Sequence, residues 1–439
     1  MSSDKRHYEQ FADGTVKDIE DEIPFAVPEG WAWCRLPEIC VIPITDGTHQ
    51  TPTYSDKENG VPFLSSKDVT SGKIDWSKIK YITKELHQEL QKRIVPKKDD
   101  ILLAKNGTTG VAAIVEDETI FDIYVTLAVI RPNQKIVYPK FLLNIINSPF
   151  CKNQFNEHLT GIGVPNLHLV DINKTFVPLP PLNEQRQITD KIGSYTVHID
   201  ELEKNKSDLQ TAIKQTKSKI LDLAIHGKLV SQDPTDEPAE ELLKRIATSD
   251  NRPYKKLDEY ESLSQIPKGW TTCKLKNICS DFIVPQRDKP KSFDGTIPWC
   301  RIEDIEGKYL NGSLSGQLVT EETIKEMNMH KCPVGSIICS CSASLGVQAI
   351  TTVECCTNQT FIGIVPYSSV LFNEYLYYLL KSQTKYFHEI ATGTTIKYIS
   401  RDKFEELHIL LPPIQEQYRI VSKIEELFSY LDNITLNLV

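Results

Sequence analysis

The clearest pattern along the chain is a stripe of positions spaced alternately four and three residues apart between Ile188 and Leu223. Nine of its eleven members are apolar, which indicates a long amphipathic helix with a heptad seam. Asn183 can cap the start of this helix and Gly227 can end it, so we expect about 44 residues and a length of roughly 66 Å. The apolar members are Ile188, Ile192, Tyr195, Ile199, Leu202, Leu209, Ile213, Ile220 and Leu223.

The same spacing returns at the end of the chain, where it predicts a second helix of roughly 39 Å. Its seam consists of Ile420, Ile424, Leu427, Leu431, Ile434 and Leu438. One amphipathic helix of this length cannot bury its stripe by itself. We therefore expect the two helices to form a long antiparallel two-helix coiled coil. The alternative is that each helix packs on its own globular unit as a core element.

A long internal repeat surrounds these helices. Residues 28–40 (PEGWAWCRLPEIC) and 267–279 (PKGWTTCKLKNIC) are identical at seven of thirteen positions. Residues 177–192 (VPLPPLNEQRQITDKI) and 409–424 (ILLPPIQEQYRIVSKI) are identical at eight of sixteen. One unit of roughly 150 residues, followed by one helix, therefore occurs twice. Its ends match well and its interior matches poorly, so one scaffold carries two different surfaces.

Each repeat mixes strand-like and helical patterns. Short apolar runs at residues 101–103, 111–115 and 124–130 predict strands, and residues 140–147 predict a helix. The second repeat shows the same order of patterns. The predicted fold class is α+β, with two similar globular domains, separated by the helix pair and related by a pseudo-twofold internal repeat.

The composition is that of an ordinary globular protein, with 40% hydrophobic and 25% charged residues. This excludes collagen-like, disordered and disulfide-knot proteins. No run of 18 apolar residues occurs, and the first six residues lack the apolar core of a signal peptide. We expect a cytoplasmic protein without a membrane span, in which the 11 cysteines are free thiols.

The formal net charge of −9 argues weakly against a nucleic-acid partner. The excess of acidic residues, however, lies outside the two large blocks. Residues 28–176 contain 17 basic and 17 acidic residues, and residues 267–411 contain 15 of each. A neutral block can still present a basic face, because a partner responds to the local field.

Sequence motifs for catalysis are lacking. The chain has no GxxxxGK[ST] phosphate loop, no HExxH zinc helix, no GxSxG nucleophile elbow and no GxGxxG motif after a strand. The cysteine spacings do not give the paired CxxC pattern of a zinc site. We predict no catalytic residue and no metal site in this chain.

Polar and basic residues gather at matched places in the two repeats. Residues 105–109 face residues 340–344, and residues 161–168 face residues 393–400. Glycine-rich polar loops of this kind can approach phosphates and base edges of DNA, although ordinary solvated loops have the same composition. The candidate DNA-binding residues are Lys67, Lys73, Lys105, Asn106, Thr108, Thr109, Asn166, His168, Arg301, Lys308, Ser340, Ser342, Thr394, Thr395, Lys397 and Tyr398.

At this point the arrangement resembles the specificity subunits of Type I restriction-modification enzymes. The resemblance lies in two variable units, each opened by a PxGW strand and closed by an LPP-x-x-EQ element. It is strongest in residues 221–246, LDLAIHGKLVSQDPTDEPAEELLKRI, which are very similar to the end of that family's central helical region. Residues 355–359 (CCTNQ) are also similar to a family Asn-Gln element, whereas the first repeat has FDIYV there.

The resemblance implies that the two units are target-recognition domains, each reading one half of a bipartite, asymmetric site in double-stranded DNA. The helices would set the gap between the halves and dock two methyltransferase subunits. Restriction subunits can also join such complexes. The chain itself would be non-catalytic and without a cofactor. S-adenosylmethionine would belong to the methyltransferase partners, which flip out an adenine.

We divide the chain into six parts. They are an N-terminal segment (1–27), target-recognition domain 1 (28–181), a central helical spacer (182–227), a linker that ends the central region (228–266), target-recognition domain 2 (267–413) and a C-terminal spacer helix (414–439). The second helix is shorter than the first. We expect residues 1–27 to pack near its end and complete the symmetry, as residues 239–266 would for the other half.

Two competing hypotheses remain. The chain could be a protein-only scaffold in which a coiled coil holds two divergent domains apart. Sequence-selective, salt-sensitive DNA binding by the assembled complex would separate this scaffold from a recognition subunit. The second hypothesis is that the chain is a self-sufficient enzyme. Turnover by the isolated chain would be the evidence for it.

Overall fold

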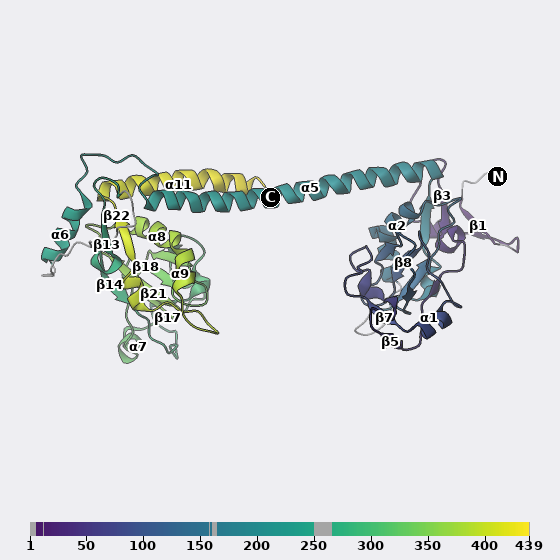
Figure 1. Ribbon diagram of the computed structural model, residues 1–439, viewed down its shortest axis with the longest axis horizontal. Helices are drawn as coiled ribbons and strands as arrows, with labels where there is room; N and C mark the ends of the chain where they lie inside the picture. The colour runs from purple at the N-terminus through teal and green to yellow at the C-terminus, as the bar shows by residue number, and fades with distance from the viewer. Residues whose placement is uncertain (1–5, 12, 158, 160–164, 250–265, 439) are drawn as a thin grey trace. The chain divides into compact units, whose positions relative to one another are not determined.

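The computed structural model describes residues 6–11, 13–157, 159, 165–249 and 266–438. The chain forms two compact units, residues 1–202 and 203–439, and each is described by itself (Figure 1). Both units combine short β-sheets with packed helices, so the predicted α+β class is confirmed.

Unit 1 contains a central antiparallel sheet in the order β4-β11-β8-β9 and a smaller mixed sheet in the order β10-β6-β7-β5. Two antiparallel pairs, β1-β2 and β3-β12, complete its strands. The strands are β1 (Tyr8–Gln10), β2 (Val16–Asp18), β3 (Ala32–Arg35), β4 (Thr45–Asp46), β5 (Tyr54–Ser55), β6 (Val61–Leu64), β7 (Lys80–Ile82), β8 (Ile101–Ala104), β9 (Ala112–Ile114), β10 (Asp122–Ile123), β11 (Leu127–Ile130) and β12 (Phe176–Leu179). The helices of its globular part are α1 (Lys84–Leu90), α2 (Pro139–Asn147), α3 (Pro149–Glu157) and α4 (Leu169–Ile172).

The central sheet of unit 1 is buried on both faces, which explains its continuous apolar strands. Successive side chains of a strand point to opposite faces. Ile101 and Leu103 accordingly join one core cluster with Phe141 of α2. Leu102 joins a second cluster with Leu64 of β6. The unit therefore has three layers, with α2 on one side of the sheet and the small sheet on the other.

Unit 2 repeats this plan. Its central sheet has the order β14-β21-β18-β19-β16, its small sheet has the order β17-β15-β20, and β13 pairs with β22. The strands are β13 (Thr271–Lys274), β14 (Cys279–Ile283), β15 (Ile297–Cys300), β16 (Tyr309–Leu310), β17 (Leu318–Val319), β18 (Ile337–Ser340), β19 (Gln348–Thr351), β20 (Cys356–Thr357), β21 (Phe361–Pro366) and β22 (His408–Leu411). The helices are α6 (Ala239–Ser249), α7 (Glu321–Glu326), α8 (Asn373–Ser382), α9 (Thr384–Ile390), α10 (Arg401–Glu405) and α11 (Ile414–Leu436).

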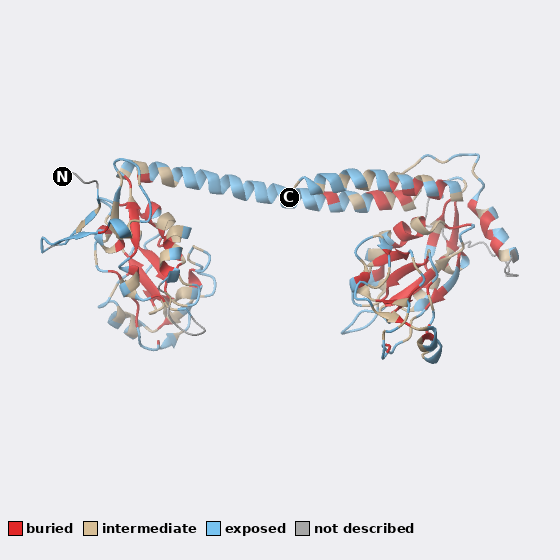
Figure 2. Cartoon of the chain, turned by 180° about the vertical axis from the view of Figure 1, so that it is seen from behind, coloured by how far each residue is buried: buried red, intermediate tan, exposed pale blue. Residues whose placement is uncertain are grey.

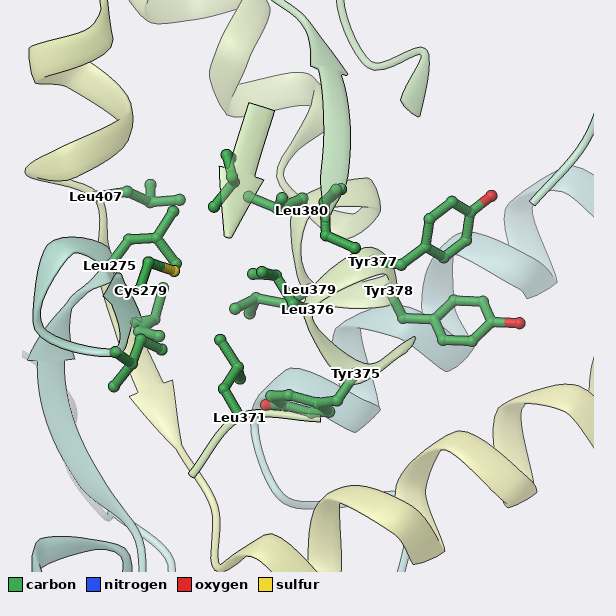
Figure 3. Close-up of a cluster of buried hydrophobic side chains, with 14 of the residues drawn as sticks. Leu275, Cys279, Leu371, Tyr375, Leu376, Tyr377, Tyr378, Leu379, Leu380 and Leu407 are labelled. Atoms are coloured by element: carbon green, nitrogen blue, oxygen red, sulfur yellow. The ribbon is translucent and has the colours of Figure 1, made fainter. Parts of the chain in front are cut away.

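The largest buried cluster of unit 2 lies where α8 covers the central sheet. Leu376 and Leu380 of α8 pack there with Leu275 and Leu407, and the ring of Tyr375 is also fully enclosed (Figure 3). The apolar spacing of α8 and the alternation of the strands thus build the same helix-on-sheet layer as in unit 1.

A buried glutamine explains why the LPP-x-x-EQ element occurs at the end of both repeats. The side-chain amide of Gln185 accepts a hydrogen bond from Tyr138 N (2.7 Å) and donates to the carbonyl oxygens of Ile136 (2.9 Å) and Pro180 (2.8 Å). Gln417 repeats all three bonds. Its partners are Phe372 N (2.8 Å), Val370 O (2.9 Å) and Pro412 O (3.1 Å). These hydrogen bonds hold the start of each long helix against the unit that precedes it.

The predicted long helix is confirmed as α5 (Leu182–Ile225). It ends two residues before Gly227, whose φ of 64° is the left-handed conformation expected of a helix stop. The predicted antiparallel pairing occurs within unit 2. There Ile213 and Ile220 of α5 are buried, as are Ile420 and Ile424 of α11.

The pairing covers only the C-terminal part of α5. Lys217 pairs with Asp432 (2.5 Å), close to the end of α11 at Leu436. The earlier seam members Ile192, Tyr195, Ile199 and Leu202 are 41–68% exposed (Figure 2). The buried seam therefore covers only the C-terminal part of α5, in keeping with the shorter second helix that the sequence predicts.

The N-terminal segment packs on unit 1. Its described residues form the β1-β2 hairpin and pack on unit 1 through Arg35, which pairs with Glu9 (2.9 Å) and Glu22 (2.8 Å). The rings of Phe25 and Trp33 stack edge to face at 5.0 Å. These contacts tie the segment to β3.

Candidate nucleic-acid interface

A polar hairpin in unit 2 joins two of the predicted loops. Thr392 and Tyr398 exchange backbone hydrogen bonds of 2.9 and 2.8 Å, which closes residues 392–398 into a loop. Tyr398 also bridges to Ser342 in the loop after β18. The exposed side chains at the tip of the hairpin are Thr394, Thr395, Ile396, Lys397 and Tyr398. The structure thus brings together the two loops that the sequence predicted in unit 2.

Unit 1 contains the same juxtaposition. Asn106, in the loop after β8, bridges to Asn166, and Leu167 N donates to Lys105 O (2.8 Å). In unit 2, Ile399 N makes the matching bond to Cys341 O (2.8 Å). Thr108 and His168 are exposed, whereas Asn106, Thr109 and Asn166 are half-buried. Residues 161–164 of the predicted loop lie outside the described residues.

Lys105 has a structural role that the sequence did not reveal. It is buried, and its ammonium group lies 2.5 Å from a carboxylate oxygen of Asp46. Burial alone would raise the pKa of Asp46, but the hydrogen bond and charge of Lys105 outweigh this effect and lower the pKa. Lys105, predicted as a DNA-binding residue, is therefore engaged inside unit 1 in this structure.

Ser340 and Lys308, also predicted to bind DNA, make internal contacts as well. Ser340 is fully buried, and its hydroxyl group donates to Ser342 O (2.9 Å). Lys308 is held by Glu374 of α8 (2.7 Å) and by Glu425 of α11. Burial lowers the pKa of Lys308, but its hydrogen bonds to the two carboxylates dominate, so the pKa is raised. Both residues belong to internal contacts of unit 2.

The remaining predicted residues lie on accessible surface. Lys67 and Lys73 are exposed, and Lys67 lies 3.8 Å from Asp68. Arg301 is half-buried at the end of β15, 3.4 Å from Glu303. Lys67 and Lys73 follow β6 in unit 1, and Arg301 follows β15, the matched strand of unit 2.

Sequence reasoning missed two polar residues at these strands, Lys80 and Gln317. Lys80 is opposite Phe63 of β6 in the ladder, and Gln317 accepts a backbone hydrogen bond from Trp299 of β15 (2.8 Å). Lys80 begins β7, a strand of three residues, and Gln317 directly precedes β17, a strand of two; such strands are too short to show an alternating pattern. The signal that could have found them is the matched Pro62 and Pro298, one residue before Phe63 and Trp299.

The cysteine thiols are free, and nine of the eleven are buried. Burial raises the pKa of Cys34, Cys40 and Cys332 to about 12, so these thiols are protonated at neutral pH. Within the described residues, no three His, Cys, Asp or Glu side chains are grouped closely enough to hold a metal ion. None of the described helices is long and apolar enough to cross a membrane.

The family model for the Type I restriction modification DNA specificity domain matches residues 28–210 and again residues 267–438. The chain belongs to this family. Its two matches coincide with the two repeats and their helices. As a Type I specificity subunit, it is the DNA sequence-recognition subunit of a restriction-modification system.

Specificity subunits of known systems align over almost the whole chain. The EcoKI specificity subunit of Escherichia coli K12 is 21% identical over 430 residues, covering 93% of this chain and 84% of that protein. The EcoAI specificity subunit of Escherichia coli is 24% identical over 491 residues, with 93% and 79% covered.

Solved chains of type I restriction-modification systems share the fold. The HsdS subunit from Thermoanaerobacter tengcongensis matches with a TM-score of 0.59 and 20% identity, over 94% of this chain and 92% of that chain. A chain from a type I restriction-modification system, solved to study complex assembly and conformational transition, matches with a TM-score of 0.63 and 21% identity, over 94% of both chains.

Proposed function

We propose that each unit of this specificity subunit reads one half of a bipartite, asymmetric site in double-stranded DNA. The observation that carries the proposal is that the two units share one arrangement of the loop backbone but present different side chains on it. The loop contact Asn106–Asn166 of unit 1 corresponds to Ser342–Tyr398 of unit 2. Different donors and acceptors on one scaffold suit the reading of two different base sequences.

In this proposal the helices have a separate task. α5 and α11 set the unspecified gap between the two half-sites and dock two methyltransferase subunits, and restriction subunits can join them. The exposed apolar residues Ile192, Tyr195, Ile199 and Leu202 support a protein partner on α5, because contiguous apolar surface marks interaction sites.

The chain itself would perform no chemistry. It would place a methyltransferase subunit over its target, and S-adenosylmethionine bound to that subunit would supply the methyl group. The acceptor would be an adenine turned out of the duplex. The assembled complex would act on DNA in the cytoplasm.

A methylation map tests this function. The chain is co-expressed with its neighbouring methyltransferase subunit in a host that lacks DNA methylation, and modified bases are then located by sequencing. We expect a split motif with a fixed gap. A single contiguous motif would mean that only one unit reads DNA. Association of the two proteins without methylation would favour the scaffold hypothesis instead.

A further inference from the structure

The small sheet of unit 2 places two polar residues on one face beside an apolar core. In the ladder between β15 and β17, Ile297 is opposite Val319, and the bond from Trp299 N to Gln317 O continues this register. Residues opposite each other in an antiparallel ladder share a face, and every second residue of a strand returns to it. Ile297, Trp299 and Arg301 therefore share one face with Val319 and Gln317.

The apolar part of this face is fully used by packing. Trp299, Val319 and Cys356 form a buried cluster with Ile324 of α7 and Met329. At the end of β15 the apolar side chains are replaced by Arg301 and Gln317, which are both half-buried. The sheet thus ends in a polar edge that the core does not use.

Hydrogen bonds are missing at this edge. Arg301 Nε and Gln317 Oε1 are buried and have no hydrogen-bond partner. The hydroxyl oxygen of Thr357 also has no partner, but Thr357 lies beside Cys300 in the ladder between β15 and β20 and therefore on the opposite face of the sheet. In the described part of the chain, only one further buried side-chain atom, Trp31 Nε1, is in this state. Native proteins rarely leave such atoms unpaired, and a group that binds there is one explanation.

Unit 1 has no such deficit at the matched positions. Its ladder places Lys80 opposite Phe63, and Ile123 beside Leu64. Ser65 corresponds to Arg301, and its hydroxyl group donates to Asp68 (2.9 Å). The ammonium group of Lys80 lies 4.2 Å from the ring centre of Tyr54. At the three matched positions, unit 1 therefore has Ser65, Lys80 and Ile123, whereas unit 2 has Arg301, Gln317 and Thr357.

The polar edge is continuous with the loops described above. Asn358 N donates to Cys300 O (3.1 Å), and Cys341 N donates to Thr360 O (2.8 Å). The turn at residues 357–360 thus connects the end of β15 to the loop after β18. That loop in turn bridges to the hairpin at Tyr398.

We propose that Arg301 and Gln317 determine the bases that unit 2 reads, and that Arg301 Nε and Gln317 Oε1 gain their hydrogen-bond partners when DNA binds. This inference rests on the proposed function. A guanidinium group matches the O6 and N7 acceptors of guanine, and a glutamine amide matches the N6 and N7 of adenine. The half-site of unit 2 then contains purines at the positions these side chains reach.

The test is the methylation map repeated with Arg301→Ala and Gln317→Ala in the full complex. Each variant should accept any base at one defined position of a single half-sequence. Methylation of the original site should fall by about 10- to 100-fold. The other half-sequence and the gap should remain as they are. The matched control is Arg245→Ala on α6, which removes an exposed arginine paired with Glu237 and should leave the map unchanged.

A second variant keeps the inference testable if an alanine variant loses its fold, as judged by its melting temperature. Gln317→Glu has nearly the same shape but only accepts hydrogen bonds, and it should shift the preferred base toward cytosine. Unchanged maps for stable variants at both positions would overturn the inference while leaving the split motif intact. A wild-type map without a split motif would instead reject the proposed function itself.

Discussion

At the scale of single residues, the same side-chain type takes opposite roles at different positions. Lys67 and Lys105 both follow short strands of unit 1, yet Lys67 is exposed and Lys105 is buried against Asp46. Asp46 is 59 residues away in sequence, so no local pattern could reveal the pair. Arg93 (2.6 Å) and His49 (3.2 Å) also contact this carboxylate.

The buried pair of Lys105 and Asp46 predicts how the stability of the protein depends on pH. Lys105→Met should lower the free energy of unfolding by about 3 kcal/mol at neutral pH, because it removes the main partner of a buried carboxylate. The lowered pKa of Asp46 means that its stabilising contribution is present above the unfolded pKa of about 3.9. The contribution is lost as the pH falls through the lower pKa of the folded state.

Chemical denaturation at several pH values measures this effect. The difference between wild type and variant should be largest near pH 7 and should narrow below about pH 4. Lys57→Met, at an exposed lysine of the same unit, is the control and should change stability by about 0.5 kcal/mol or less. A difference of equal size at all pH values would contradict the role given to the pair.

At the scale of elements, the buried glutamines fasten each unit to its helix. Gln185→Leu should destabilise unit 1, and Gln417→Leu should destabilise unit 2. Each variant leaves one backbone N–H and two carbonyl oxygens without the side-chain amide that paired them, at a cost of about 1–3 kcal/mol per unpaired group.

Limited proteolysis together with thermal unfolding would locate the loss in one unit. The exposed neighbour Gln187 provides the control, since Gln187→Leu removes no buried hydrogen bond. If the Leu variants at Gln185 and Gln187 lowered stability equally, the buried hydrogen bonds of Gln185 would not be what holds α5 to unit 1.

Elements with a long repeat could be predicted from the sequence, and very short ones could not. The heptad pattern gave α5 to within a few residues at each end, and the repeat gave two α+β units. The site was predicted less well. Its two loops were found through the repeat, but the place of Gln317 beside β15 and the internal contacts of Lys105, Ser340 and Lys308 were not. Strands such as β17 have two residues, and burial against distant partners leaves no local signal.

At the scale of the whole molecule, a change in α5 should alter the spacing of the recognised site without altering what each unit reads. Deleting residues 203–209 removes one heptad, about 10 Å of helix, keeps the seam in register and leaves Ile192, Tyr195, Ile199 and Leu202 in place. This stretch precedes the part of α5 that packs on α11 in unit 2, so the helix pair remains.

The methylation map of this deletion should show both half-sequences with a gap shorter by up to about 3 base pairs. Deleting four residues instead breaks the heptad register and serves as the comparison. Loss of one half-sequence in the seven-residue deletion would contradict the spacing role of α5.

The exposed stripe on α5 has a further consequence for the chain when it is made alone. Ile192, Tyr195, Ile199 and Leu202 place four large apolar side chains along one helical face in water. Such a face favours self-association, which grows with concentration. Aggregation of the chain expressed by itself, and its solubility when a partner is synthesised with it, would both follow from this one face.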